Sequence, residues 1–340
     1  AGNDLAAIMT RRGLSEADVI AAAKTFTPSG RHDEYMIMAS GGHGGNLIAI
    51  GVPSMRILKY VAVFGPESWQ GYGYGGLGDK VLYDDSKQGG KEVTWGDVHH
   101  PNFSETNGDY DGEFIFVNDK ANARVAVVDL RDFMTKQIVT NKLVMSDHGG
   151  AFVTPNTEYV VETSQYATPL GGAFAPLSDY NDKYRGAVMF WKFDREKGKI
   201  DEAQSWAIEL PPYAQDLRDA GKLDSYGYVI IGSWNTERSA GTEGQGKPYT
   251  ESGASQNDVD YLHIVDWKKA EQLIAAGNNK VVNGVRIIPL EVAAAENVLV
   301  MAPEPKSPHG CDVTPDGKAI VVGGKLDTHT TIFEFSKIKD

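Results

Sequence analysis

The sequence predicts an all-β protein of the β-propeller class, and three observations support this. Glycine is abundant, with 38 in 340 residues, which favours a turn-rich β protein. Short apolar runs separated by turns recur along the chain. A longer phrase also recurs, in which a histidine in a turn is followed by a threonine, a second turn and an apolar strand. Its three copies begin at His100, His148 and His309. Repeated short-strand units of this kind are typical of propellers.

The composition excludes several classes of protein. Apolar residues make up 41% and charged residues 23%, close to the averages for globular proteins. The net charge of −13 disfavours nucleic acid as a partner. No apolar run approaches the ~18 residues of a membrane span. Cys311 is the single cysteine, so neither an intrachain disulfide nor a CxxC site can form. The chain begins at Ala1 without a signal segment, which leaves a cytosolic protein and a mature exported protein both open.

We expect residues 1–34 to form an N-terminal arm and residues 35–340 to form the propeller. In the arm, Ser15 can cap a short helix that carries Glu16 and Asp18 in its first turn. Short helices are also expected at 212–222 and 268–276. Five groups of strands are expected, at 35–39, 46–51 and 57–63; 114–117, 124–130 and 136–140; 159–162, 187–193 and 199–210; 228–232 and 260–266; 319–322 and 330–335.

These groups would supply about four blades and the start of a fifth, because a blade takes ~40–45 residues. Unpaired blade edges are unfavourable. The ring would therefore include further blades, or it would close with help from the N-terminal segment. Residues 237–257 interrupt the fourth group and are rich in glycine, serine and threonine, which predicts a surface loop or an ion-holding loop.

The segment Asp97-Val98-His99-His100-Pro101 is the strongest local candidate for a metal site. Adjacent side chains on a strand point to opposite faces, but in a turn that enters an inner strand both histidines could reach the hub. Pro101 should hold His100 in an extended conformation. Asp97 is placed to accept an imidazole N–H and so to select the tautomer. Read alone, the segment could also be an ordinary polar turn.

His148 and His309 are equivocal alone, but each starts the same repeat unit as His100. In a propeller that position lines the hub, so we expect these histidines to converge. Converging imidazoles are costly unless they share protons or bind a metal, and an all-nitrogen set suits copper or zinc better than calcium or magnesium. Four other histidines are expected to be structural: His32, His43, His263 and His329.

The other motifs in the sequence give weaker indications of function. Glu237 and Asp260 flank the insertion and could hold a hard cation through carboxylate oxygens, or they could be two solvated carboxylates. The stretch at 41–45 lacks the lysine and serine or threonine of a phosphate loop. Neither a Ser-His-Asp arrangement nor a G-x-S-x-G elbow is evident.

Several phrases together resemble the nitrous oxide reductase family, and the resemblance covers residues 35–340. The phrases are Gly-Gly-His-Gly-Gly at 41–45, Gly-Val-Pro-Ser-Met-Arg at 51–56, Gly-Tyr-Gly-Tyr-Gly at 71–75, Gly-Asp-Val-His-His-Pro at 96–101, Asn-Asp-Lys-Ala-Asn-Ala-Arg-Val-Ala at 118–126, and Pro-His-Gly at 308–310 with Pro-Asp-Gly-Lys at 315–318.

The resemblance implies a periplasmic, homodimeric copper enzyme that reduces nitrous oxide to dinitrogen and water. It implies a seven-bladed propeller with a four-copper, sulfide-bridged cluster, called CuZ, held by seven histidines. It also implies a cupredoxin domain whose CuA centre takes electrons from a carrier such as a cytochrome c or a cupredoxin. The last three CuZ histidines and the CuA domain would lie beyond residue 340, so we expect this chain to be incomplete for activity.

Matched position by position, His99, His100, His148 and His309 resemble CuZ ligands. Asp97 resembles the carboxylate beside them and could donate a proton during catalysis. Four residues match the calcium ligands of the family less closely: Trp234, Glu237, Asp260 and Ser307. Trp234 stands where tyrosine is common in the family, and Ser307 stands where asparagine is common. Two alternatives stay open, a propeller that serves as a binding scaffold and a calcium-dependent hydrolase, neither with copper chemistry.

Overall fold

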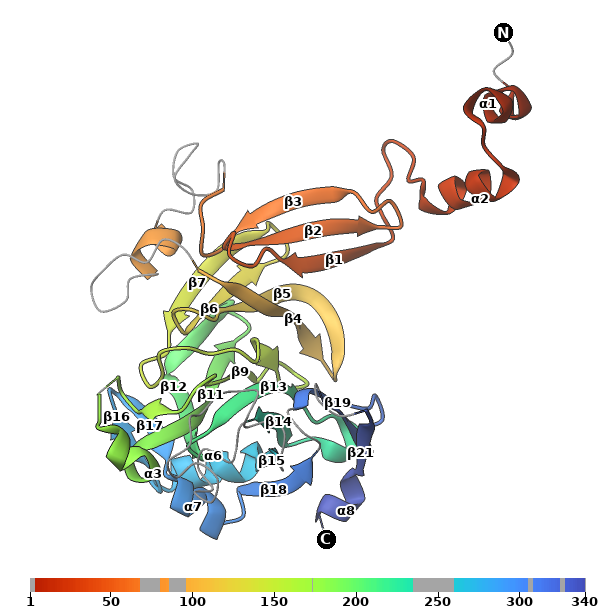
Figure 1. Cartoon of the computed structure of the whole chain (residues 1–340). Coiled ribbons are helices and arrows are strands. Elements are labelled where there is room, and N and C mark those ends of the chain that lie inside the picture. Colours follow the sequence, from red (N-terminus) through yellow and green to blue (C-terminus); the bar gives the residue numbers. More distant parts are fainter. Residues whose placement is uncertain are drawn as a thin grey trace.

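The computed structural model describes residues 4–67, 80–85, 96–172, 174–234, 260–304, 308–324 and 328–339. Its architecture is mostly β, with five sheets and short helices between their strands (Figure 1). The predicted all-β class is therefore confirmed, whereas the number of propeller blades stays a prediction. Within those ranges, every helix is too short or too polar to cross a membrane.

Two helices, α1 (Leu5–Arg12) and α2 (Glu16–Thr25), precede the sheets and project away from them (Figure 1). The helix predicted after Ser15 is α2. Ser15 Oγ accepts a hydrogen bond from the Asp18 amide at 3.2 Å, and the Asp18 carboxylate accepts one from the Ser15 amide at 2.8 Å. Neither helix buries a side chain, so capping rather than packing stabilises them.

The described strands form five sheets, numbered I to V in the order in which the chain enters them. Sheet I consists of β1 (Tyr35–Ser40), β2 (Asn46–Val52) and β3 (Ile57–Ala62). Sheet II consists of β4 (Val98–Thr106), β5 (Asp109–Asp119), β6 (Arg124–Asp129) and β7 (Met134–Thr140). Sheet III consists of β8 (Phe152–Val153), β9 (Tyr159–Thr163), β10 (Thr168–Pro169), β11 (Tyr184–Asp194), β12 (Lys199–Leu210), β16 (Lys280–Val282) and β17 (Val285–Ile288).

Sheet IV consists of β13 (Ala214–Ala220), β14 (Tyr228–Trp234), β15 (Asp260–Asp266) and β18 (Leu299–Glu304), and sheet V of β19 (Pro308–Val313), β20 (Ala319–Gly324) and β21 (Thr330–Glu334). Among the described strands, every pair is antiparallel except β12 with β17. The remaining α-helices that the structure describes are α3 (Tyr180–Lys183), α6 (Trp267–Ala275), α7 (Leu290–Ala295) and α8 (Phe335–Lys339). The helix predicted at 268–276 is α6.

Apolar side chains fill the space between each pair of successive sheets. On β5, Ile115 and Val117 pack towards sheet I, whereas Phe114 and Phe116 pack towards sheet III, because side chains alternate along a strand. Similar clusters join sheet III to sheet IV and sheet IV to sheet V. Sheets II, III and IV are therefore buried on both faces, which explains the apolar runs in their middle strands β6, β9 and β14.

The first strands of neighbouring sheets lie against one another. β4 contacts β1 and β8, and β13 contacts β8 and β19. This packing brings together the beginning of β4, the loop before β8 and the beginnings of β13 and β19. Three of those places carry the histidines of the repeated phrase.

The helix predicted at 212–222 is wrong, because this segment contains the strand β13. Its polar side chains are buried between sheets, and Gln215, Asp216 and Arg218 are at most 1% exposed. Arg218 Nε donates to the carbonyl oxygen of Val161 in the next sheet at 2.8 Å. Arg218 and Asp216 contact Val161 and His148 outside this strand, and this tertiary context outweighs local propensity.

Arg124 and Asp119 form a fully buried ion pair, with Arg124 Nη2 2.6 Å from Asp119 Oδ2. Arg124→Met would leave the buried carboxylate without its charged partner. We expect the free energy of unfolding, measured in urea, to fall by about 3–5 kcal/mol. Lys183→Met is the matched control, because it removes the exposed ion pair with Asp179 and should leave stability unchanged. Equal stabilities of the two variants would contradict the expectation.

Candidate metal centre

Three histidines from different parts of the chain meet at one place. Their ligand nitrogens all lie within 4.8 Å of one another in the group formed by His99, His100 and His148. Their ring centroids are 5.2 to 5.3 Å apart. His309 is the fourth member, with its ring centroid 6.1 Å from that of His148. The four histidines selected from the sequence thus lie together, whereas their role as metal ligands stays a prediction.

An irregularity in β4 lets adjacent histidines point to the same place. The pairing of β4 with β5 shifts register between His99 and Asn102, and His100 has a φ of 42°. A regular strand would send the two side chains to opposite faces, whereas a bulge re-aims one of them. The extended backbone predicted for His100 is therefore wrong, because the bulge outweighs the preference imposed by Pro101.

Two glycines allow the His148 loop to approach its neighbours. A Cβ at Gly149 would lie 2.6 Å from the carbonyl oxygen of Asp216, and a Cβ at Gly150 would lie 2.5 Å from the Cβ of His100. Gly150 also has a φ of 81°, which glycine adopts without strain. At the start of β19, the pairing with β20 shifts register between Pro308 and Gly310, so His309 also lies at an irregularity in its strand.

Two buried carboxylates orient the imidazole rings. Asp97 Oδ1 lies 3.1 Å from Nε2 of His99, and Asp216 Oδ1 lies 3.1 Å from Nδ1 of His148. Each carboxylate favours a proton on the nitrogen that it faces, which leaves the other ring nitrogen as a lone-pair donor. Asp97 was selected from the sequence. Asp216 was missed, because it lies in the segment read as a helix and no local pattern links it to His148.

Burial favours neutral imidazoles in this cluster. It lowers the pKa of His100 to about 4, with further contributions from His148 and His99. It also lowers the pKa of His99, although the nearby Asp97 carboxylate opposes this shift. Nε2 of His100 is buried and has no hydrogen-bond partner in the described part of the chain. Neutral rings with free nitrogens are the form in which histidine binds metals, so this donor set fits copper or zinc.

The residues predicted to bind calcium are described only in part. Glu237 and Ser307 lie outside the described residues. Asp260 is fully buried at the start of β15, and Trp234 is buried at the end of β14. An indole N–H can only donate, so the Trp234 side chain cannot be a ligand and only its carbonyl oxygen could bind a cation.

A second carboxylate that the sequence reasoning missed lies opposite Asp260. Glu304 on β18 is its cross-strand partner, and Glu304 Oε1 accepts a hydrogen bond from the Ser233 amide at 3.1 Å. Its other oxygen is buried without a hydrogen-bond partner among the described residues. Burial raises the pKa of Glu304, and the charges of Asp260 and Asp216 raise it further. A hard cation would relieve the repulsion between these carboxylates.

The other described histidines lie outside the cluster. His43 is exposed, but its Nδ1 is 3.6 Å from Asp97 Oδ1, at the edge of the site. His263 is fully buried, with Nε2 2.8 Å from the Tyr213 hydroxyl. His32 and His329 are exposed on the surface.

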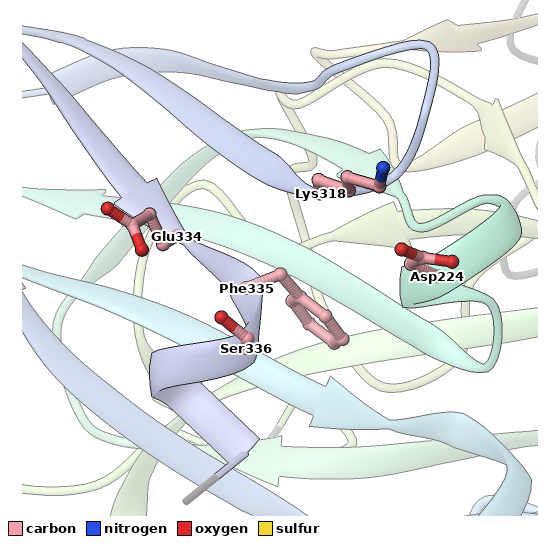
Figure 2. A pocket seen from close by; sticks show the side chains of 5 residues that line it. All are labelled: Asp224, Lys318, Glu334, Phe335 and Ser336. Atoms are coloured by element: carbon pink, nitrogen blue, oxygen red, sulfur yellow. The ribbon is translucent and has the colours of Figure 1, made fainter.

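A pocket of about 520 Å³ lies between the loop after β13, the turn before β20 and the beginning of α8 (Figure 2). It mixes two carboxylates, one amine and an aromatic ring, from Asp224, Lys318, Glu334, Phe335 and Ser336. It contains no imidazole, so it is not the metal centre indicated by the repeated histidines.

Fold and site together define a mostly β protein with a partly buried imidazole cluster suited to copper or zinc. The chain is similar to nitrous-oxide reductases along nearly its whole length. It is 29% identical to the enzyme of Pseudomonas fluorescens and 28% identical to that of Stutzerimonas stutzeri, in each case over 98% of this chain and 50% of the relative. The family resemblance predicted from the motifs is thereby confirmed. The chain spans about half the length of the curated relatives that it matches.

No protein-family model matches the chain. Among solved structures, U3-55K is similar at a TM-score of 0.46 and 10% identity, over 88% of this chain and 58% of that chain. A similarity this distant supports no conclusion about function.

His263 predicts a pH dependence of stability. Burial lowers its pKa to about 4 in the folded protein, from 6.5. The unfolded state therefore takes up a proton first, and stability falls as the pH drops from 6.5 towards 4. At about 1.4 kcal/mol per pKa unit, this residue should contribute about 3 kcal/mol to the loss.

The test compares His263→Phe with the unchanged protein in urea unfolding between pH 4 and 8. The variant should be less stable at pH 7, because it loses the hydrogen bond with Tyr213. The difference should shrink or reverse as the pH falls to 4. A difference that stays constant across this range would contradict the assignment of a depressed pKa.

Proposed function

We propose that this chain is part of a copper enzyme of the nitrous-oxide reductase family, in which it supplies His99, His100, His148 and His309 to the CuZ cluster. The observation that carries the proposal is the group of three imidazoles whose ligand nitrogens lie within 4.8 Å of one another. Similarity to nitrous-oxide reductases over 98% of the chain supports the choice of copper. The activity belongs to the complete protein, of which this chain spans about half.

The proposal includes a β-propeller at residues 35–340, preceded by the arm at 1–34. Burial of sheets II, III and IV on both faces, with the first strands meeting, supports sheets that radiate from a hub. In the proposed enzyme, further blades would supply the remaining histidines, and a CuA domain would receive electrons from a cytochrome c or a cupredoxin. A periplasmic location, a homodimer and nitrous oxide as substrate are inferred from the family resemblance.

The reaction combines nitrous oxide, two protons and two electrons to form dinitrogen and water. When bound, a copper cluster would supply the electrons and a surface of positive charge for the departing oxygen. The chain would orient the ligands through Asp97 and Asp216, which select the tautomers of His99 and His148. Asp97 also lies between half-buried His99 and exposed His43, at 3.1 and 3.6 Å, so it can pass a proton from the surface to the site.

The two alternatives fit the site less well. A binding scaffold would not require imidazoles in mutual contact, because converging rings gain little without a shared metal or proton. A calcium-dependent hydrolase would need oxygen donors where the repeat places nitrogen donors.

Copper content tests the central proposal. The purified complete protein should contain several copper atoms with sulfide, and His99→Ala and His148→Ala should each remove most of this copper because each deletes a ligand. His329→Ala is the matched control, since this exposed histidine lies outside the cluster, and it should retain the copper. Elemental analysis provides the measurement. Unchanged copper in both ligand variants would exclude the cluster as the binding site.

Calcium removal tests the proposed hard-cation site at Asp260 and Glu304. Chelation should lower the melting temperature, because a cation that binds only the folded state adds about 2.7 kcal/mol at a concentration 100-fold above its dissociation constant. Glu304→Gln should abolish most of this calcium-dependent shift. Glu334→Gln, on the exposed strand β21, is the control and should retain it. A shift of the same size in both variants would refute a role for Glu304.

A further inference from the structure

Residues Asn118, Asp119 and Lys120, at the end of β5, contact both segments that carry the clustered histidines. One segment is Asp97 with the adjoining start of β4, and the other is the loop at 146–148. We call these three residues the 118–120 clamp. The sequence marks them only as part of a family-like phrase, and the proposed function does not use them.

The clamp holds the backbone of Asp97 from both sides. Asp119 Oδ1 accepts a hydrogen bond from the Asp97 amide at 2.8 Å, and the Lys120 amide donates to the Asp97 carbonyl oxygen at 2.9 Å. Asp119 is fully buried and is itself anchored by Arg124, whose Nε lies 2.7 Å from Oδ2. The start of β4, and with it His99, is therefore attached to a rigid buried ion pair.

The same residues hold the His148 loop. Asn118 Nδ2 donates to Asp147 Oδ1 at 2.8 Å, and the Ser146 hydroxyl donates to the Lys120 carbonyl oxygen at 2.9 Å. Asn118 and Asp147 are at most 1% exposed, so water cannot replace the bond between them. Asn118 also pairs directly with His99 across β4 and β5. One side chain thus links the strand position opposite His99 to the residue before His148.

We infer that the clamp sets the separation between the His99–His100 pair and His148, with the Asn118 amide as the positioning residue that joins them. This inference rests on the proposed copper site and deepens it. A shared metal centre tolerates little displacement of its ligands, so a ring separation of 5.2 Å between His99 and His148 must be held by groups outside the rings. The Asn118–Asp147 bond is the side-chain hydrogen bond that joins the clamp to the His148 loop.

The test uses added Cu²⁺ and the complete metal-free protein. Asn118→Leu removes the donor at similar volume, and N118D places a carboxylate against that of Asp147. Both should weaken Cu²⁺ binding about 10–100-fold, as changes to groups that orient metal ligands do. The electron paramagnetic resonance spectrum should show fewer coupled nitrogens. Gln137→Leu is the matched control, because it breaks an amide bridge to Ile200 far from the histidines and should leave the spectrum unchanged.

A rescue variant separates positioning from general stability. In N118D/D147N the donor and acceptor exchange places, so the bond re-forms in the opposite direction, and Cu²⁺ affinity and nitrogen coupling should return. Wild-type binding by Asn118→Leu, or a double variant that stays weak or does not fold, would overturn the inference. If N118D alone fails to fold, the Cu²⁺ affinity of N118D/D147N still tests the inference: restored affinity supports it, and weak binding overturns it.

Failure of the proposed function would be distinguishable. If the wild-type protein binds no Cu²⁺, the copper proposal is refuted. The role of the clamp is then tested by crystal structures of the variants. In that case the His99–His148 ring separation should exceed 5.2 Å in Asn118→Leu and return in N118D/D147N. An unchanged separation in Asn118→Leu would overturn the clamp as well.

Discussion

Burial of the three middle sheets on both faces is the constraint on which the rest of the structure depends. A sheet covered on one side by apolar side chains needs one partner, whereas a sheet covered on both sides must lie between two. Alternation along β5, with Ile115 facing sheet I and Phe116 facing sheet III, forces this stacking. Stacked sheets bring their first strands into contact, and the candidate site lies where those strands begin.

The site departs from regular structure wherever a histidine must reach it. The register shift at His99, the positive φ of His100 and the glycines after His148 all re-aim side chains or allow close approach. Such departures cost free energy and persist because surrounding contacts determine the backbone. The bulge in β4 is held by bonds from 118–120, which ties the irregular segment to regular strands.

A buried polar network packs against the His148 loop. Arg218 is fully buried, and burial lowers its pKa to about 9, although Glu162 and Asp147 oppose this shift. Burial raises the pKa of both carboxyl groups. The Arg218 guanidinium lies where a side chain at Gly149 would otherwise extend. The loop therefore packs against a satisfied ionic group rather than against a cavity, which restricts the positions open to His148.

The sequence by itself determined some strands of each sheet, the all-β class, the family resemblance and the candidate histidines, because each depends on residues that are near one another in the chain. Alternation and turns define strands, and the repeated histidine–threonine phrase marks equivalent positions. Only the tertiary structure decided that 212–222 is a strand, that Asp216 faces His148, that Glu304 faces Asp260 and that Asn118 reaches Asp147. Those contacts join residues between 29 and 68 positions apart on different strands or loops. No local pattern encodes them, since they exist only when packed sheets exclude water and bring distant polar groups together.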